Sequence, residues 1–419
     1  MNNQSLRLSA DRSPQGVTLA NWQDPPFNRW AFLHLGELLT MAPISRGAGA
    51  PRELPRADRD ISGLAFEVRG DRMTIGQMLD QTCTDAFIVL QDGKVVAEQY
   101  ADGMSENTLH LTMSVSKSLT SALAGVLAAQ GRIDPAAEVP AYVRELRGTS
   151  FDGCTVQHLL DMRAGTKWSE DYGNFPESDA FVYEQVMGWR PRQTAGLAPD
   201  MYAYMSGLTE NARPHGGPFD YRSILTDVLG WVLERCGGQQ FAELFSREVW
   251  SRLGAEHDAQ VTIDSAGCAI TDGGICTTLR DLARFGQLYL DGGGGIVPPG
   301  WAGRVTTADR ELVEAFSAAP EAALYPGALY HDLWWVISPE RGIFAALGIY
   351  GQMLLVHRTA SAVVAKFSTQ LEPIDLHSDY LQITAAIALC DALAAERSPS
   401  RSLPVNVNKR PDDPPEERS

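Results

Sequence analysis

The chain of 419 residues has little positive charge and no long apolar run. Lys and Arg number 35 against 52 Asp and Glu, which leaves a formal net charge of −17 at pH 7. A field of that sign repels phosphate backbones and anionic lipid headgroups, so we expect neither nucleic acid nor a membrane as partner. A membrane-spanning helix needs about 18 or more consecutive apolar residues, and the sequence has no such run. A small cationic or zwitterionic ligand fits the charge better.

Signals for export, disulfides and metal binding are also missing. The N-terminus lacks the basic start and apolar core of a secretory signal, so we expect a cytoplasmic protein. The six cysteines are scattered without CxxC spacing or histidine partners, which fits neither a zinc site nor a disulfide framework. The eight histidines are dispersed and no HExxH motif occurs. We therefore expect no metal and no cofactor.

The composition is that of a globular chain with polar ends. Hydrophobic residues make up 44% of the chain and charged residues 21%, which excludes fibrous and wholly disordered classes. Residues 1–20 and 396–419 cannot bury enough apolar surface to offset the entropy lost on ordering, so we expect two disordered tails. Residues 21–395 are then expected to form a single domain.

Strand patterns occur near both ends of this domain. Segment 86–100 has two apolar runs around an Asp-Gly turn, which is a strong β-hairpin signal. Further segments have strand-like or apolar helical patterns: strands at 334–337, 342–356 and 362–367, and a helix at 380–395.

These patterns predict an α+β fold. We expect one antiparallel sheet built from both chain ends and flanked by helices. The α/β lobe would comprise about 21–150 and 321–395, and a helical lobe at about 151–320 would be inserted between them.

The strongest candidate for chemistry is the S-x-x-K motif of Ser114 and Lys117. Apolar residues at helical spacing follow it and Gly131 is a natural stop, so the motif opens a predicted helix. Lys117 lies one turn after Ser114, close enough for its amine to reach the hydroxyl. Unpaired backbone N–H groups at this positive helix end could also stabilise an oxyanion.

The S-x-x-K motif also has an ordinary interpretation. Ser114 could be a helix N-cap and Lys117 a solvated side chain, and a chance match is expected in about one chain in three at this composition. A lysine amine is normally protonated and cannot accept a proton, so the chemistry requires burial or cationic neighbours around it.

Two further segments could complete such a site. Tyr221 and Ser223 lie two residues apart in a turn before a helix predicted over 224–235, and a phenol there could relay a proton. A buried tyrosine with a satisfied hydroxyl is the alternative. Gly348 lies inside an apolar strand, where glycine often marks close approach to the backbone, so a main-chain N–H could donate to an oxyanion. Otherwise Gly348 marks a bulge.

S-x-x-K, Y-x-S and a glycine-bearing strand, in this order, resemble the motifs of the serine β-lactamase-like hydrolases, a family that includes penicillin-binding proteins, class C β-lactamases, esterases and amide hydrolases. Within it the sequence is most similar to the 6-aminohexanoate-dimer hydrolases, over about 22–395. The resemblance implies that Ser114 is the acylated nucleophile, Lys117 its base, and Tyr221 the acid/base for the leaving group and the deacylating water. It also implies an oxyanion hole from the backbone N–H groups of Ser114 and Ile349, and a homodimer.

We expect four more residues at the substrate cleft. By the resemblance, Tyr172 and Trp189 line and close it. The loop that precedes Trp189 is acidic and aromatic, and a carboxylate near the acyl group would favour a substrate with an ammonium group. We choose Glu184 for this role, with Asp272 second. The alternative is a solvated acidic loop.

The sequence thus predicts a serine hydrolase of linear amides, similar to the 6-aminohexanoate-dimer hydrolases, whose partner is a small amide or ester. A carboxylesterase of short acyl esters is the main alternative, because both reactions pass through an acyl-Ser114. No G-x-S-x-G elbow is present, which argues against an α/β-hydrolase esterase.

Two other functions fit less well. A β-lactamase or peptidoglycan enzyme is disfavoured because the third motif has Ala346-Leu347-Gly348 in place of K-T-G, and because Y-x-S lacks the asparagine of the β-lactamase motif. A non-catalytic binding module is disfavoured because all three catalytic candidates are present.

Overall fold

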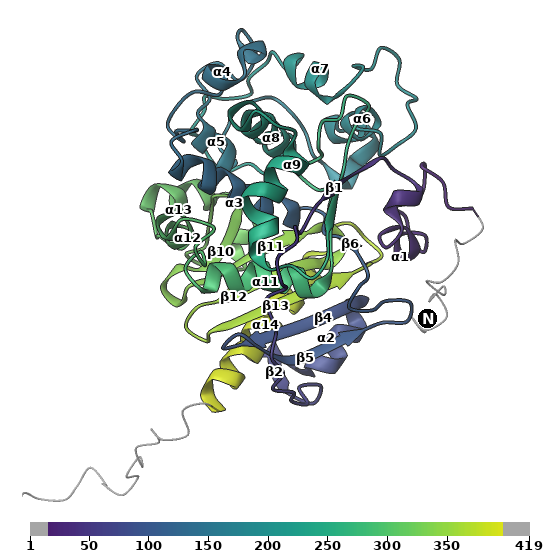
Figure 1. The fold of residues 1–419 in the computed structure, drawn as a ribbon, viewed down its shortest axis with the longest axis vertical. Coiled ribbons are helices and arrows are strands. Elements are labelled where there is room, and N and C mark those ends of the chain that lie inside the picture. Colours follow the sequence, from purple (N-terminus) through teal and green to yellow (C-terminus); the bar gives the residue numbers. More distant parts are fainter. Residues whose placement is uncertain (1–15, 397–419) are drawn as a thin grey trace, which may run out of the picture.

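The computed structural model describes residues 16–396 (Figure 1). Its centre is a seven-stranded antiparallel sheet of order β5-β4-β13-β12-β11-β10-β9. Its strands are β4 (Thr84–Gln91), β5 (Lys94–Tyr100), β9 (Leu329–His331), β10 (Trp334–Ser338), β11 (Ile343–Gly348), β12 (Gln352–His357) and β13 (Ala362–Ser368). β4 pairs with β13, so the sheet joins strands from both ends of the chain as predicted.

The predicted hairpin is β4 and β5. Asp92 and Gly93 both have positive φ, 51° and 74°, as a two-residue type I′ turn requires. The predicted strand over 342–356 is instead the two strands β11 and β12, separated by the short helical turn η8 (Ile349–Gly351). Gly348 and Gly351 flank this break, and the strand pattern of the apolar residues on both sides predicts one continuous strand.

Helices cover both faces of the sheet. One hydrophobic cluster joins β13 residues Ala362 and Val364 to α14 (Leu376–Glu396) and α2 (Ile75–Gln81). The other joins Val363 and Ala365 to α11 (Leu279–Leu290) and α3 (Val115–Ala129). Alternate residues of one strand therefore pack into different cores, which explains why these strands are apolar throughout.

The helical part lies against the α3 side of the sheet, at the top of Figure 1. α3 and α8 (Ile224–Gly237) pack against each other at its centre. The remaining helices are α1 (Asn28–Ala31), α4 (Val139–Tyr142), α5 (Val156–Leu160), α6 (Asp179–Val186), α7 (Met201–Ser206), α9 (Phe241–Phe245), α10 (Ser251–Leu253), α12 (Pro299–Arg304), α13 (Arg310–Phe316) and the 3-10 turn η6 (Pro320–Ala323).

The region expected to be a helical lobe also contains strands. A four-stranded sheet of order β1-β7-β8-β6 comprises β1 (Met41–Ile44), β7 (Ala259–Thr262), β8 (Ile275–Thr277) and β6 (His110–Leu111). A separate hairpin pairs β2 (Ala65–Val68) with β3 (Asp71–Thr74). Strands of two to four residues are too short to show a period in sequence. β6 ends just before Ser114, so this small sheet helps to position the S-x-x-K motif.

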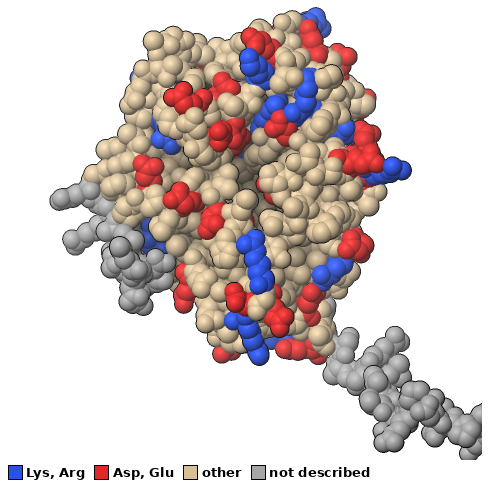
Figure 2. Space-filling view, turned by 180° about the vertical axis from the view of Figure 1, so that it is seen from behind, with Lys and Arg blue, Asp and Glu red and all other residues tan. Residues whose placement is uncertain are grey.

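The chain ends and the surface add two observations. Residues 16–20 of the expected N-terminal tail are described, and Val17 and Leu19 pack against the hydrophobic core; the rest of both expected tails, apart from Glu396 at the end of α14, lies outside the described residues. Within residues 16–396, no helix is long and apolar enough to cross a membrane. On the face seen in Figure 2, basic and acidic side chains are interspersed and form no continuous basic stripe.

Candidate active site

The start of α3 brings Ser114 and Lys117 together. Ser114 precedes the helix, and its hydroxyl makes no N-cap hydrogen bond with the helix backbone. The side chain of Lys117 is only 1% exposed, so it is not a solvated surface lysine. Its Nζ lies 2.9 Å from Ser114 Oγ, 3.0 Å from Ser223 Oγ and 2.7 Å from the carbonyl oxygen of Asp272. These contacts aim the amine at the hydroxyl of Ser114.

Ser223 links Lys117 to Glu170, which the sequence analysis did not single out. Ser223 donates from its backbone N–H to Glu170 Oε2 at 2.7 Å and from its hydroxyl to Oε1 at 2.9 Å. Tyr172 also donates to Glu170 Oε1, at 3.1 Å. Burial raises the pKa of Glu170, and the nearby Lys117 opposes this rise. No fixed spacing relates these residues in sequence, so only the fold reveals the network.

Asp227 fixes the loop that supplies the Asp272 carbonyl. Asp227 Oδ1 accepts hydrogen bonds from the backbone N–H groups of Thr271 and Asp272, at 2.8 and 3.0 Å. Tyr183 donates to Asp227 Oδ2 at 3.0 Å. Because Asp227 is buried, its pKa is raised well above its usual value. Asp227 therefore acts on Lys117 through the loop it holds, and was also missed from the sequence.

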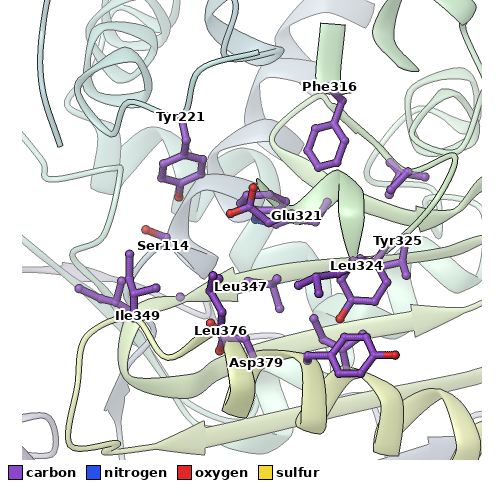
Figure 3. A pocket seen from close by; sticks show the side chains of 18 of the residues that line it. Ser114, Tyr221, Phe316, Glu321, Leu324, Tyr325, Leu347, Ile349, Leu376 and Asp379 are labelled. Atoms are coloured by element: carbon purple, nitrogen blue, oxygen red, sulfur yellow. The ribbon is translucent and has the colours of Figure 1, made fainter. Parts of the chain in front are cut away.

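Tyr221 faces the same hydroxyl. Its ring stacks on Trp335 with centroids 5.6 Å apart, and Lys117 Nζ lies 5.1 Å from the Tyr221 ring centre. The phenol oxygen points towards Ser114 (Figure 3). Burial raises the pKa of Tyr221 well above its usual value, while a hydrogen bond with Ser114 acts in the opposite direction. The phenol is therefore protonated at neutral pH and can donate.

Gly348 lies directly against the backbone around Ser114. A Cβ at this position would be 2.8 Å from the carbonyl oxygen of Thr112 and 3.0 Å from the backbone nitrogen of Ser114. Only glycine fits here. The sequence led us to expect a close approach of a ligand to this strand, and in the structure it is the backbone of residues 112–114 that approaches Gly348. Ile349 follows at once and lines the space in front of Ser114.

Two cavities meet at Ser114. The larger, of about 220 Å³, runs towards α14, and the smaller, of about 40 Å³, lies towards α6. Ser114, Glu170, Tyr172 and Ile349 line both of them. Figure 3 shows Ser114, Tyr221 and Ile349 at one end of the larger cavity. Ser114 is thus open to ligands while Lys117 behind it is closed off.

The smaller cavity contains the carboxylates expected to bind a substrate ammonium. Glu184 lines it, but its carboxylate accepts hydrogen bonds from Arg190 and from Gln23 Nε2, the latter at 3.1 and 3.2 Å. Asp272 Oδ2 lies 3.9 Å from Lys117 Nζ. Glu184 therefore has an internal cationic partner, which argues against the ammonium role expected for it. Asp272 Oδ1 is buried and has no hydrogen-bond partner in the described chain, so the role expected for Asp272 stays a prediction. The sequence shows Arg190, but it does not show that the Arg190 guanidinium pairs with the Glu184 carboxylate.

Trp189 and Tyr172 form walls of the cleft. Trp189 Nε1 donates to Thr262 Oγ1 at 3.2 Å, and the indole of Trp22 donates to the carbonyl of Trp189 at 2.7 Å. The ring of Tyr172 is stacked on Phe175 with centroids 5.2 Å apart. These hydrogen bonds hold Trp189 in the wall of the smaller cavity, whereas Tyr172 lines both cavities.

One cluster has the composition of a metal site. Asp161, His331 and Asp332 place potential ligand atoms within 4.8 Å of one another. Arg304 already donates to both carboxylate oxygens of Asp332, at 2.7 and 2.6 Å, and His331 Nδ1 lies 2.8 Å from Asp161 Oδ1. A guanidinium in this position repels a cation, so we assign the cluster a structural role.

Comparisons with known proteins show the family of this chain. The sequence matches the Beta-lactamase family over residues 74–388. It is 38% identical over 385 residues to the 6-aminohexanoate-dimer hydrolase of Paenarthrobacter ureafaciens, which covers 90% of this chain and 94% of that protein.

Solved structures share this fold over most of the chain. A protein of Bacillus anthracis assigned as a 6-aminohexanoate-dimer hydrolase superposes with a TM-score of 0.81 at 28% identity, covering 92% of this chain and 98% of that one. A family VIII carboxylesterase shares the fold at 16% identity and a TM-score of 0.53, over 72% of this chain and 92% of its own. A family match across most of the domain, together with this fold, shows that the chain is a hydrolase of the beta-lactamase family.

Proposed function

We propose that the protein hydrolyses linear amides through an acyl-enzyme on Ser114. The observation that carries this proposal is the buried amine of Lys117, 2.9 Å from a serine hydroxyl that opens into two cavities. A base held against an accessible hydroxyl is the arrangement that nucleophilic catalysis requires.

Acylation follows from the positions of these groups. Lys117, in its unprotonated form, takes the proton of Ser114 as Oγ attacks the substrate carbonyl carbon. The backbone N–H groups of Ser114 and Ile349 stabilise the oxyanion. Tyr221 gives its proton to the amine nitrogen as the C–N bond breaks, and the Lys117 ammonium restores the proton of the phenol.

Deacylation uses the same groups in reverse. A water molecule attacks the acyl carbon and loses a proton towards Tyr221 and Lys117. The proton then returns to Ser114 Oγ as the carboxylic acid leaves. The enzyme regains its starting state, and one water has been consumed for one amide bond cleaved.

The substrate class rests on similarity. The relative from Paenarthrobacter ureafaciens is a 6-aminohexanoate-dimer hydrolase, and 38% identity over nearly the full length supports a linear amide of this kind. The apolar Ala346-Leu347-Gly348 segment offers no cation for the carboxylate of a β-lactam, which makes β-lactam hydrolysis less favoured. Esters remain open, because ester cleavage needs the same acyl-Ser114 and an easier leaving group.

The first experiment compares an amide with an ester. We expect release of free 6-aminohexanoate from its linear dimer by the wild type, and no release by Ser114→Ala. Ser105→Ala, which changes an exposed serine, is the matched control and should match the wild type. Mass spectrometry after mixing with p-nitrophenyl butyrate should find the butyryl group on Ser114.

The alternatives give different results in the same assay. If the ester alone is cleaved and Ser114→Ala is inert, the protein is a carboxylesterase that uses this site. If neither substrate is cleaved and Ser114 is not acylated, the proposed function is wrong. The homodimer and the cytoplasmic location expected from the sequence stay predictions, to be tested by light scattering and by cell fractionation.

A further inference from the structure

The larger cavity has an apolar wall that continues to the protein surface. It begins at Ser114 and passes between η6 and the start of α14 (Figure 3). Its apolar lining includes Phe316, Leu324, Leu347, Ile374, Leu376 and Ile383. Among the described residues, the exposed large hydrophobic side chains are Leu371, Ile374 and Leu376, all in the segment that leads into α14. A hydrocarbon chain attached to the reacting carbonyl or amine would find apolar contacts from Ser114 to the cavity mouth.

The charged groups along this cavity are all acidic. Glu170, Glu321 and Asp379 line it, and no Lys, Arg or His does. Glu170 is already hydrogen-bonded to Ser223 and Tyr172. The other two lie further from Ser114, Glu321 on η6 and Asp379 on α14 (Figure 3).

Glu321 and Asp379 both have carboxylate oxygens without a hydrogen-bond partner among the described residues. Within residues 16–396, the side chain of Glu321 has no hydrogen bond or ion pair. Asp379 accepts one hydrogen bond from Gln382 Nε2, at 3.0 Å, and its other oxygen has no partner in the described chain. Burial raises the pKa of Asp379 to about 7, although the buried Lys366 behind it acts in the opposite direction. This contrasts with Glu184, which Arg190 occupies.

A third polar group in the cavity also lacks a partner. The hydroxyl oxygen of Tyr325 is buried and makes no hydrogen bond in the described structure. Burial raises the pKa of Tyr325, and the nearby Tyr380 and Asp379 raise it further. A buried polar atom without a partner is costly, so its presence in a cavity points to a ligand group that satisfies it.

We propose that this cavity binds an unbranched aliphatic portion of the substrate, and that Glu321, Asp379 and Tyr325 select a chain that ends in an amine over one that ends in a carboxylate. This inference rests on the proposed function. The ammonium would be attracted by the negative charge of the two carboxylates and would offer a donor to the phenol oxygen, while the methylene groups of the chain lie against the apolar wall. A terminal carboxylate would meet like charge without a cation to receive it.

The test uses substrates that differ only at the chain end. One series holds p-nitrophenol as leaving group and varies the acyl part: acetyl, butyryl, hexanoyl, 6-aminohexanoyl and 5-carboxypentanoyl. A second series holds a butyryl group and varies the amine: hexylamine, 1,6-diaminohexane and 6-aminohexanoate. We expect kcat/KM to rise about fourfold per added methylene in one series, as burial of each methylene predicts. In that series the amine-terminated substrate should exceed the carboxylate-terminated one at least 100-fold.

Variants then assign the selectivity. For each variant, the kcat/KM of the amine-terminated and of the carboxylate-terminated substrate is divided by the kcat/KM of the neutral substrate of equal length. The ratio of these two values, amine to carboxylate, should fall at least tenfold in Glu321→Gln/Asp379→Asn. Glu314→Gln neutralises an exposed acid on the neighbouring helix α13 and should leave this ratio unchanged. Leu324→Trp, which fills the cavity from η6, should remove the dependence on chain length.

Failure of this inference can be told from failure of the proposed function. One outcome is that the acetyl and butyryl esters are cleaved through Ser114 while neither series prefers the amine-terminated substrate. The cavity then does not select substrates by the charge of the chain end, and the inference is wrong. An unchanged ratio in the double variant would overturn it as well. Absence of any Ser114-dependent cleavage would instead refute the proposed function.

Discussion

Two buried lysines, in two regions of the molecule, each contact a serine hydroxyl, but the two serines differ in their access to ligands. Lys117 on α3 is 1% exposed and Lys366 on β13 is fully buried, and each amine contacts a serine hydroxyl, Ser114 or Ser368. Ser114 opens into both cavities, whereas Ser368 is completely buried. Burial of a lysine beside a serine is therefore not sufficient for catalysis, because the nucleophile must also reach a substrate.

The charges around the two amines differ as well. Lys117 Nζ lies 3.9 Å from Asp272 Oδ2, and Glu170 is one hydrogen bond further away through Ser223. Lys366 has no ion pair in the described chain; its partners are Ser368, Gln382 Oε1 at 2.9 Å and backbone carbonyls. Burial lowers the pKa of Lys366 to about 7, although Asp85 and Asp379 act in the opposite direction. The amine near the cavities thus has a carboxylate within 4 Å, whereas Asp85 and Asp379 act on the amine of Lys366 from a longer distance.

The sharpest test of this comparison removes each amine in turn. We expect Lys117→Met to lower kcat/KM about 10²–10⁴-fold, the usual contribution of a general base, because the Lys117 amine lies 2.9 Å from Ser114 Oγ. Lys366→Met should change kcat/KM less than tenfold. Circular dichroism should show that both variants fold. Equal losses in the two variants would mean that Lys366 also supports the reaction.

A second test alters the wall that gives Ser114 its access. Gly348→Ala places a Cβ 2.8 Å from the carbonyl oxygen of Thr112 and 3.0 Å from the nitrogen of Ser114. The strand end and Ile349 must then move away, and we expect kcat to fall about 10²–10³-fold, as for loss of one oxyanion donor. Gly300→Ala, on exposed α12 with open space around its Cβ, is the control and should retain full activity. Full activity of Gly348→Ala would show that Ile349 does not donate to the oxyanion.

The smallest expected effect is the pH dependence of stability that Lys366 causes. Its pKa is lowered on folding from 10.5 to about 7, so between these values the unfolded chain binds one more proton than the folded chain. The free energy of unfolding should therefore rise with pH across this window, by up to about 1.4 kcal/mol per pH unit. Urea titrations at pH 7, 8 and 9 should show the free energy of unfolding of the wild type rising with pH relative to that of Lys366→Met.

An exposed lysine provides the control for this titration. Lys94, at the start of β5, is exposed, so Lys94→Met should show the same pH dependence as the wild type. If Lys366→Met also follows the wild type from pH 7 to 9, the Lys366 amine is charged in the folded protein.

Local patterns predicted much of the fold and part of the site. The hairpin of β4 and β5 depends on an Asp-Gly turn between apolar runs, and α3 on apolar residues at helical spacing, so both could be read from short stretches. The proximity of Ser114 and Lys117 follows from one helical turn. By contrast, β6 and β8 are too short to show a period, and their pairing joins residues 110–111 to 276–277.

Side-chain pairings that local patterns do not reveal account for what was missed or wrong. Glu170 and Asp227 reach the site only because α8 packs against α3. Glu184 was expected to bind an ammonium group from the acidic composition of its loop, yet Arg190 and Gln23 occupy its carboxylate. Composition gives the sign of a region's charge, whereas the state of one carboxylate depends on which side chain lies beside it.

The sequence by itself determined the fold class, the strands at both chain ends and the serine-lysine pair, because hydrophobic periodicity and helical spacing act over a few residues. The tertiary structure alone decided which lysine lies behind an open serine, which carboxylates are paired and where the cavities run. Those properties depend on contacts between segments far apart in the chain, and burial and pairing there set the energies of the charged groups.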